Sequence, residues 1–366
     1  MRKVTQIISK RKRKRTEKQI QLLEDEKLHV GIDAHKNSYY LAIWSVDRNI
    51  LISTWRQPAN MALLCRKLEP YRQNIVHIVY EASFCGYTLV RTLQEAGFDT
   101  DVISPSRMPR ENSKRPKTDR IDCKKLAMFD AKGMLHTVYV PTLQEDADRQ
   151  VVRLREMVKK KLARVKQQIK CFLMYNGIPE PEGVKRFAKK GVQALHDLEL
   201  SKELRFCLDE LLDEYHYLTQ RLKPVVKKVN EIAATERHKE AITRWRTIPS
   251  VSVLTAMTFR TEMMDLDRFD KGREIGMMLG LAPQIQSSGE SRREGPITKT
   301  GNQRLRTMLV VTAWKWIMFD LSAEETFLRI YNNTRSKKKA IVAMARKLGI
   351  IMWRMYVRKE NYRQAA

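Results

Sequence analysis

The sequence predicts a mixed α/β domain followed by mainly helical regions. Between residues 28 and 104, short apolar runs rich in β-branched and aromatic residues alternate with helical patterns. After Pro141, apolar residues instead recur every three or four positions, which is the spacing of helices. A chain of 366 residues is long enough for several domains. We expect a basic extension over 1–27, an α/β domain over 28–140, a helical coiled-coil region over 141–240 and a mainly helical domain over 241–366.

The α/β domain is expected to hold a sheet with helices on its faces. The turn residues Asp47, Arg48 and Asn49 separate two strand patterns and favour an antiparallel meander of the first three strands. The later strands are joined through helices, which favours parallel pairing. A mixed sheet in a layered α/β domain follows. The expected strands cover 28–33, 39–46, 50–55, 75–80 and 101–104, and the expected helices cover 61–68 and 87–96.

Two long helical seams follow and predict a helical hairpin. The first alternates three- and four-residue steps over 151–172, and the second does so over 204–232, where Pro224 is expected to introduce a kink. An apolar stripe of this kind can pack within one chain or mediate assembly with other chains. The face opposite the first seam is basic. Further on, we expect a loop-rich stretch over 280–302 and helices over 303–319 and 337–357. The first seam comprises Val151, Leu154, Val158, Leu162, Val165, Ile169 and Phe172.

Net charge points to a nucleic-acid partner. Lysine and arginine total 70 against 42 acidic residues, a net charge of +28, and nucleic acid is the simplest partner that offsets such self-repulsion. No apolar run of about 18 residues is present to span a bilayer, and residues 1–27 lack a cleavable apolar stretch. We therefore expect an intracellular protein with no membrane association. The five cysteines form no Cys-x-x-Cys pair and the histidines lack metalloprotease spacing, so any metal is expected to be a hard, oxygen-bound ion.

Four carboxylates predict a metal site. Asp33 and Glu81 each end an apolar strand, and both emerge at one sheet end if these strands pair in parallel. Asp119 and Asp122, three residues apart after the N-cap candidate Thr118, face the same way on a helix. Four converging acids repel one another, so a divalent cation such as Mg2+ (or Mn2+) makes the cluster tolerable. The alternative is that each acid caps an element or is simply solvated. Nearby cations that can contact phosphates are Lys114, Arg115, Lys117, Lys124 and Lys125.

The Gly31-Ile32-Asp33 sequence also opens actin-like sugar kinases. Those proteins need a glycine-rich phosphate loop later in the chain. No convincing loop of that kind follows, so the sequence favours the carboxylate site.

A serine-rich stretch predicts either a nucleophile or a phosphate-binding turn. Ser287 and Ser288 precede Gly289, an arrangement that exposes a hydroxyl. A Ser-Ser-Gly turn that only grips phosphate remains the alternative. No histidine lies nearby in the sequence, so activation would come from a metal, an acid or a basic side chain. The surrounding cations that can receive a scissile phosphate are Arg292, Arg293, Lys299, Arg304 and Arg306.

These motifs, in this order and spacing, resemble the DEDD transposases of bacterial insertion sequences, which are serine recombinases guided by a bridge RNA. The resemblance covers about residues 28 to 357. It rests on the segments Gly31–Lys36, Glu81–Ser83 with Gly86-Tyr87, Lys117–Asp122, Ser287–Gly289 and Ile297–Asn302 with Leu305-Arg306.

The resemblance implies a ribonuclease-H-like (RuvC-like) domain similar to Holliday-junction resolvases. It implies that Asp33, Glu81, Asp119 and Asp122 bind Mg2+, and that a C-terminal serine domain uses Ser288, or alternatively the adjacent Ser287, to form a covalent phosphoserine link to DNA. It further implies a coiled-coil middle that assembles dimers or tetramers, bridge RNA held between protomers, DNA of the element ends and target as substrate, and a location in the bacterial cytoplasm at the nucleoid.

The chain departs from the family's pattern in one turn. The family often has Pro-Gly-x-Gly where this sequence has Pro249-Ser250-Val251-Ser252, so this turn is expected to approach phosphate less closely. Residues 1–27 lie outside the resemblance. Two other functions stay open: a metal-dependent nuclease or junction resolvase without a covalent intermediate, and a non-catalytic RNA-binding assembly protein.

Overall fold

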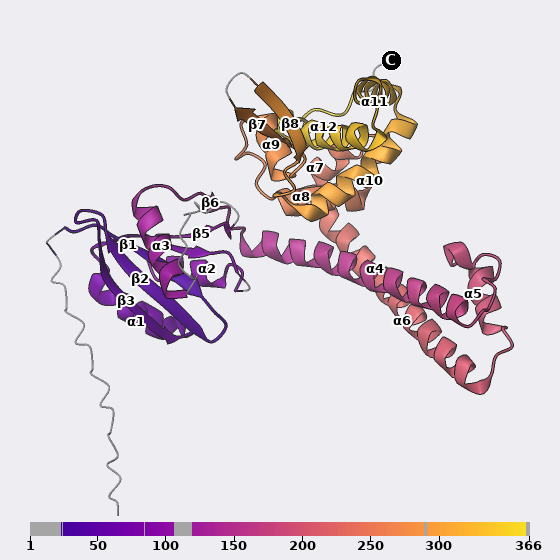
Figure 1. Ribbon diagram of the computed structural model, residues 1–366, viewed down its shortest axis with the longest axis horizontal. Coiled ribbons are helices and arrows are strands. Elements are labelled where there is room, and N and C mark those ends of the chain that lie inside the picture. Colours follow the sequence, from indigo (N-terminus) through magenta and orange to yellow (C-terminus); the bar gives the residue numbers. More distant parts are fainter. Residues whose placement is uncertain (1–22, 24, 84, 106–118, 289–290, 364–366) are drawn as a thin grey trace, which may run out of the picture. The chain divides into compact units, whose positions relative to one another are not determined.

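A computed structural model describes residues 23, 25–83, 85–105, 119–288 and 291–363 (Figure 1). The chain divides into two compact units, Met1–Val140 and Pro141–Ala366. Within the described ranges, none of the helices is both long enough and apolar enough to cross a membrane.

A six-stranded mixed sheet forms the centre of the first unit, in the order β3-β2-β1-β4-β5-β6. The expected antiparallel meander is confirmed, because β1 pairs with β2 and β2 with β3 in antiparallel fashion. The expected parallel pairing is also confirmed for β1 with β4 and β4 with β5. A short antiparallel edge strand, β6, was not predicted. The strands are β1 (Leu28–Ala34), β2 (Ser38–Ser45), β3 (Ile50–Pro58), β4 (Ile75–Glu81), β5 (Thr100–Ile103) and β6 (Thr137–Val138).

Helices cover both faces of this sheet. Alternate residues of a strand face opposite sides, and Val30 and Ile32 of β1 belong to the apolar cluster that contains α1 (Met61–Leu68) and α2 (Thr88–Glu95). On the other face, α3 (Asp119–Ala131) packs against β1, β2 and β4. The mixed α/β sheet domain expected from the sequence is therefore present.

Two long helices, α4 (Leu143–Tyr175) and α6 (Lys202–Ala233), lie side by side in the second unit, with α5 (Lys189–His196) between them in the sequence (Figure 1). A capping box formed by Thr142 and Glu145 begins α4. Their shared core includes the predicted seam residues Val165 and Ile169. Leu154, also placed in the seam, is 40% exposed. Helix α6 continues through Pro224.

A helical core completes the second unit. Trp245 is fully buried in it and donates from Nε1 to the carbonyl of Met352 at 2.6 Å. Val152 of α4 and Val229 of α6 belong to the same core, so the base of the long helices packs with the C-terminal helices. The predicted helices over 303–319 and 337–357 are confirmed. The helices are α7 (Glu236–Trp245), α8 (Val253–Met263), α9 (Gly272–Met278), α10 (Gln303–Phe319), α11 (Leu321–Thr334) and α12 (Lys337–Arg358).

The expectation of a loop-rich stretch over 280–302 is wrong. This stretch contains β7 (Pro283–Ser288) and β8 (Ser291–Ile297), which pair in antiparallel fashion with Ser288 opposite Ser291. Serine and glycine are typical of loops, but the backbone hydrogen bonds between the two segments outweigh that local preference.

Candidate active site

Two predicted acids lie at the same end of neighbouring parallel strands. Ile32 of β1 pairs with Tyr80 of β4, so the next positions in the two strands are Asp33 and Glu81. Gly31 and Val79 face α3. Asp33 and Glu81 each lie two residues further along the same strands, so they belong to the same face of the sheet. The strand register therefore supplies the parallel pairing, with both acids at one end of the sheet, that the sequence could only assume.

Helix α3 approaches these strand ends with the residues around Asp122. A Cβ atom on Gly31 would lie 2.2 Å from the carbonyl oxygen of Cys123, so only glycine allows this close approach. The helix runs antiparallel to β1, because Cys123 lies against Gly31 while the later residue Asp130 contacts His29, which comes earlier in the strand. The N-terminal end of α3, which carries Asp122, consequently points toward the end of β1 that carries Asp33.

The electrostatics at this end agree with that placement. His35 Nε2 lies 3.2 Å from Asp33 Oδ2, whose side chain is 17% exposed. Burial, together with the negative charge of Asp33, raises the pKa of the Cys123 thiol to about 11. Cys123 thus stays a neutral thiol beside the acids.

Not every predicted ligand is brought together. Asp119 begins α3, but its side chain, together with Lys117 and Thr118, lies outside what the structure describes. Within the described side chains, Asp33, Glu81 and Asp122 do not form a group with all ligand atoms inside 4.8 Å. Carboxylates repel one another, so tighter convergence depends on a cation. The all-oxygen donor set fits Mg2+ or Mn2+.

The predicted nucleophile lies in the second unit. Ser288 is the last residue of β7, and its neighbour Ser287 pairs with Arg292 of β8. Side chains from 285 to 294, which include Arg292 and Arg293, lie outside the described part. Lys299 is exposed and follows the hairpin.

Arg304 and Arg306, two predicted phosphate contacts, have partners within the chain. Arg306 donates to the carbonyl oxygens of Leu279 and Gly301. Arg304 pairs with Glu156 of α4. Asn302 caps α10 by accepting from the backbone amides of Arg304 and Leu305. A cavity of about 440 Å³ adjoins this helix start, lined by Arg153, Glu156, Lys160, Glu262, Asn302, Gln303, Arg304 and Thr307.

Glu262 holds three elements together, and no pattern in the sequence indicates this role. This residue of α8 is 2% exposed. It accepts two bonds from Arg153 of α4, at 2.7 and 2.8 Å, and one from Asn302 at 2.8 Å. Burial alone would raise the pKa of Glu262, but the bonds from Arg153 and Asn302 and the nearby positive charge lower it below 4.5. The network fixes the end of the segment that follows the serine hairpin.

Replacing Glu262 with Gln is expected to lower the free energy of unfolding by about 3 kcal/mol, because a buried ion pair loses one partner. Because the pKa of Glu262 is lower in the folded than in the unfolded protein, its charge stabilises the fold at a pH above the unfolded-state pKa. This stabilisation is lost as the pH falls through the folded-state pKa. The difference between variant and wild type should therefore shrink in acid. Urea unfolding at several pH values measures this, with the exposed Glu324→Gln as a control; a pH-independent difference would contradict it.

The turn that departs from the family's pattern carries backbone strain. Ser250 has a φ of 73°, in the left-handed region that costs a residue other than glycine about 1 kcal/mol. Ser252 accepts from the amide of Thr255 and caps α8. The chain thus keeps, with serine, a conformation that glycine adopts more easily.

Comparisons with known proteins connect both units to transposases. Residues 30–175 match the model of DEDD transposases of the IS110 type, and residues 243–329 match that of the transposase IS116/IS110/IS902 family. A putative transposase of Sinorhizobium fredii is 29% identical over 290 residues, covering 78% of this chain and 71% of the relative. The transposase for insertion sequence element IS1328 of Yersinia enterocolitica is 26% identical, covering 88% of this chain and 95% of the relative.

Among solved structures, T. thermophilus RuvC in complex with Holliday junction substrate matches with a TM-score of 0.24 and 11% identity, over 31% of this chain and 99% of that one. The two family matches include residues of both units and agree with the curated relatives. Both units of the chain are therefore similar to insertion-sequence transposases of the IS110/IS116 type.

Proposed function

We propose that this transposase is an RNA-guided DNA recombinase that cuts and rejoins DNA through a covalent phosphoserine intermediate. The observation that carries the proposal is the strand register that aligns Asp33 with Glu81 beside the α3 end that bears Asp122. A nuclease of the metal-dependent kind needs such a set of converging carboxylates. We infer that the protein acts at the nucleoid, on the DNA at the ends of the insertion sequence and on the target DNA.

The acids and the serine take different parts of the reaction. Asp33, Glu81, Asp119 and Asp122 would hold Mg2+ or Mn2+, which when bound polarises a phosphodiester oxygen. The hydroxyl of Ser288 attacks the phosphorus, a serine–phosphate bond forms, and the phosphorus–oxygen bond to the leaving deoxyribose oxygen breaks. That oxygen gains the proton that the serine loses and becomes a hydroxyl. The bond energy stays in the phosphoserine ester, so a second hydroxyl can rejoin the strand.

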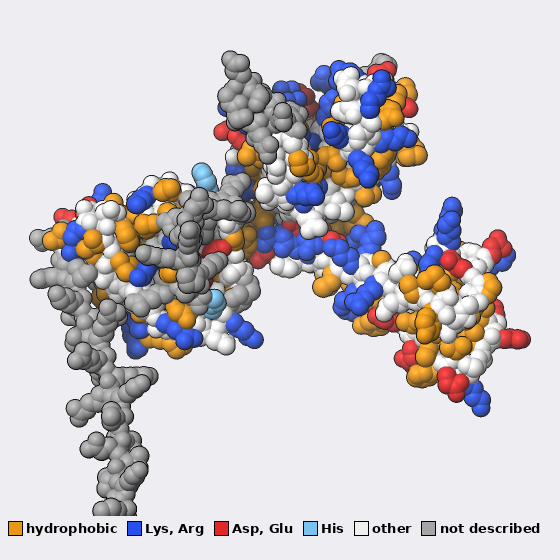
Figure 2. Space-filling model, in the orientation of Figure 1, with side chains coloured by type: hydrophobic (Ala, Val, Ile, Leu, Met, Phe, Trp, Pro, Cys, Tyr) orange, Lys and Arg blue, Asp and Glu red, His pale blue; other side chains and the backbone are white. Residues whose placement is uncertain are grey.

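Basic side chains of the second unit are suited to hold the nucleic acids. Lys159, Lys160, Lys161 and Arg164 are exposed along α4 (Figure 2). Partial burial and the charges of Arg155 and Lys315 lower the pKa of Lys159, so this cluster of like charges gains from an anionic partner. Arg304 and Arg306 would exchange their hydrogen-bond partners within the chain for phosphate or orient neighbouring side chains. We also assign phosphate contacts to Lys117, Arg292, Arg293, Lys299, Arg304 and Arg306.

Assembly through the long helices completes the proposal. Apolar side chains are strongly exposed near the end of α4 and the start of α6, where Met174 is 78%, Tyr175 89% and Phe206 65% exposed. Apolar surface of this kind favours contact with another chain. A dimer or tetramer would use these helices and hold a bridge RNA between protomers.

Trapping experiments test the recombinase function. Full-length protein is incubated with insertion-sequence end DNA, candidate RNA and Mg2+, then denatured and examined for a protein–DNA adduct. Asp122→Asn is expected to lower adduct formation and cleavage at least ~100-fold, because one carboxylate of the metal set is lost. Asp99→Asn, at an exposed aspartate of the same unit, should behave as wild type.

Three outcomes contradict the proposal. Nicked DNA without an adduct in wild type would support a metal-dependent nuclease or resolvase. Full activity of Asp122→Asn, or activity undiminished by a chelator, would remove the carboxylate site from the reaction. Nucleic-acid binding with neither cleavage nor an adduct would support a non-catalytic RNA-binding assembly protein.

A further inference from the structure

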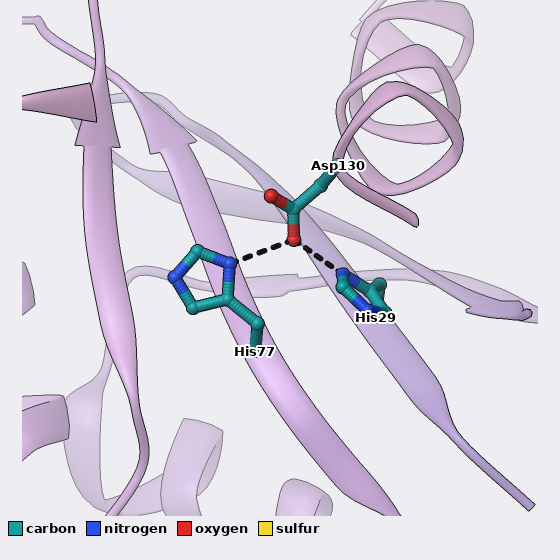
Figure 3. A group of neighbouring side chains, drawn as sticks. All are labelled: His29, His77 and Asp130. Carbon is teal, nitrogen blue, oxygen red and sulfur yellow. Dashed lines mark hydrogen bonds and ion pairs between the residues drawn. The ribbon is translucent and has the colours of Figure 1, made fainter. Parts of the chain in front are cut away.

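A second group of metal-ligand side chains lies on the α3 face of the sheet, near the beginning of the parallel strands. His29 of β1 pairs with His77 of β4 in the strand register, and Asp130 lies in the last turn of α3. Asp130 Oδ2 lies 2.6 Å from His29 Nδ1 and 2.9 Å from His77 Nδ1. In Figure 3 the carboxylate lies between the two imidazole rings. Three elements thus direct nitrogen and oxygen donors at one point.

We propose that His29, His77 and Asp130 bind a divalent transition-metal ion of the Zn2+ type. Their ligand atoms all lie within 4.8 Å of one another, so small side-chain movements would bring each of them to the bond length of about 2.0–2.2 Å from a central ion. Two imidazoles and one carboxylate leave one position of a tetrahedron for water. The side chains are 15%, 17% and 9% exposed, so the ion would be partly shielded yet reachable from solvent.

Asp101 of β5 adds a separate reason for a metal. Its Oδ2 lies 3.5 Å from Nε2 of His77, on the ring edge that faces away from Asp130. Histidines that bind metals with one ring nitrogen typically direct the other toward a carboxylate, which fixes the tautomer and the ring orientation. Asp101 is therefore a positioning residue for His77.

The chemistry of this site differs from that of the strand-end acids. Imidazole nitrogen favours Zn2+, Co2+ or Ni2+, whereas a set of carboxylates favours Mg2+ or Mn2+. His29 and Asp33 are four residues apart along β1, which corresponds to roughly 13 Å. An ion at the histidines would fasten the end of α3 to β1 and β4, and so stabilise the helix that carries Asp122.

The expectation that any metal would have only oxygen ligands is therefore revised by this proposal. Neither histidine belongs to a chelating sequence motif, and Asp130 comes from a third element. Only the pairing of β1 with β4 and the packing of α3 bring the three together.

Zn2+ binding to the full-length, chelator-stripped protein tests the site. Titrations contain excess Mg2+, which occupies carboxylate sites, and calorimetry gives affinity and stoichiometry while thermal unfolding gives the shift in Tm caused by Zn2+. Wild type is expected to bind one ion per chain and to gain stability with it. His77→Gln and Asp130→Asn should lose at least ~100-fold in affinity, and Asp101→Asn about 10–100-fold.

Control variants distinguish Zn2+ binding at these three residues from binding elsewhere on the chain. His136→Gln, at an exposed histidine of the same unit, should bind Zn2+ as wild type does. Asp33→Asn should also bind Zn2+ normally, although it is expected to lose DNA cleavage, because Asp33 is not a ligand of the histidine site. Co2+ bound to wild type should give the strong visible absorption of a tetrahedral nitrogen and oxygen site, a readout that needs no variant. The proposal would be overturned if wild type did not bind Zn2+, if Co2+ gave octahedral absorption bands, or if His77→Gln bound Zn2+ with the affinity of wild type. Asp130 would then only form hydrogen bonds with His29 and His77.

Discussion

Alanine at Ser288 is expected to abolish the denaturation-resistant protein–DNA adduct and to lower strand rejoining at least ~1,000-fold. A nucleophile cannot be replaced by its neighbours, because the bond to phosphorus forms only at its own oxygen. Denaturing gels with end-labelled DNA measure the adduct, and recovery of joined product measures the second step. Binding of DNA should stay within a few-fold of wild type, since the hydroxyl contributes little to affinity.

Two neighbouring serines serve as matched controls. Ser287→Ala and Ser291→Ala remove the same hydroxyl from positions next to Ser288 in β7 and opposite it in β8, and both should retain the adduct. If the adduct survives in Ser288→Ala and disappears in Ser287→Ala, the nucleophile is Ser287. If it survives in every serine variant, the phosphoserine mechanism is wrong.

Gly31→Ala is expected to lower the free energy of unfolding by about 3 kcal/mol and to remove DNA cleavage. The added methyl group would overlap the backbone of α3, at 2.2 Å from the Cys123 oxygen and 2.5 Å from the Ala127 nitrogen, and overpacking against backbone cannot be relieved by a change of rotamer. The helix must move away from β1, and Asp122 moves with it. Urea unfolding and a cleavage assay performed below the variant's Tm measure the two effects.

Gly133→Ala is the control for this substitution. Its Cβ would meet nothing within 4 Å, although its φ is 63°, so the cost should be limited to the roughly 1 kcal/mol of left-handed strain. Cleavage should be unaffected, because Gly133 lies beyond the end of α3. A folded Gly31→Ala variant that cleaves DNA normally would show that the packing of α3 against β1 does not determine the positions of the acids.

The predicted strands and helices follow from local patterns that the sequence states directly. The mainly apolar runs of β1 and β4 predict buried strands, and Asp33 and Glu81, near the ends of these runs, still pair with Tyr40 and Ile103 in the sheet. The helix over 337–357 is as clear, since its apolar stripe recurs with helical spacing and becomes the buried side of α12. In such segments local preference and tertiary packing favour the same structure.

Long-range pairing decided the features that the sequence did not reveal. The Gly31-Ile32-Asp33 segment suggested a metal-binding acid, but only the parallel register of β1 and β4 aligns that acid with Glu81, and only the packing of α3 explains why residue 31 is glycine. The stretch 280–302 looked like a loop because its composition is polar, whereas bonds between β7 and β8 make it a hairpin.

By itself, the sequence determined the charge, the first five strands and the main helices, the acids near the strand ends and the family's motifs, all of which depend on neighbours along the chain. The tertiary structure alone brought His29, His77 and Asp130 to one point and placed the buried Glu262 between Arg153 and Asn302. The physical reason is that a ligand set or a buried ion pair depends on distance in space, and residues far apart in the chain become neighbours only when the sheet has paired and the helices have packed.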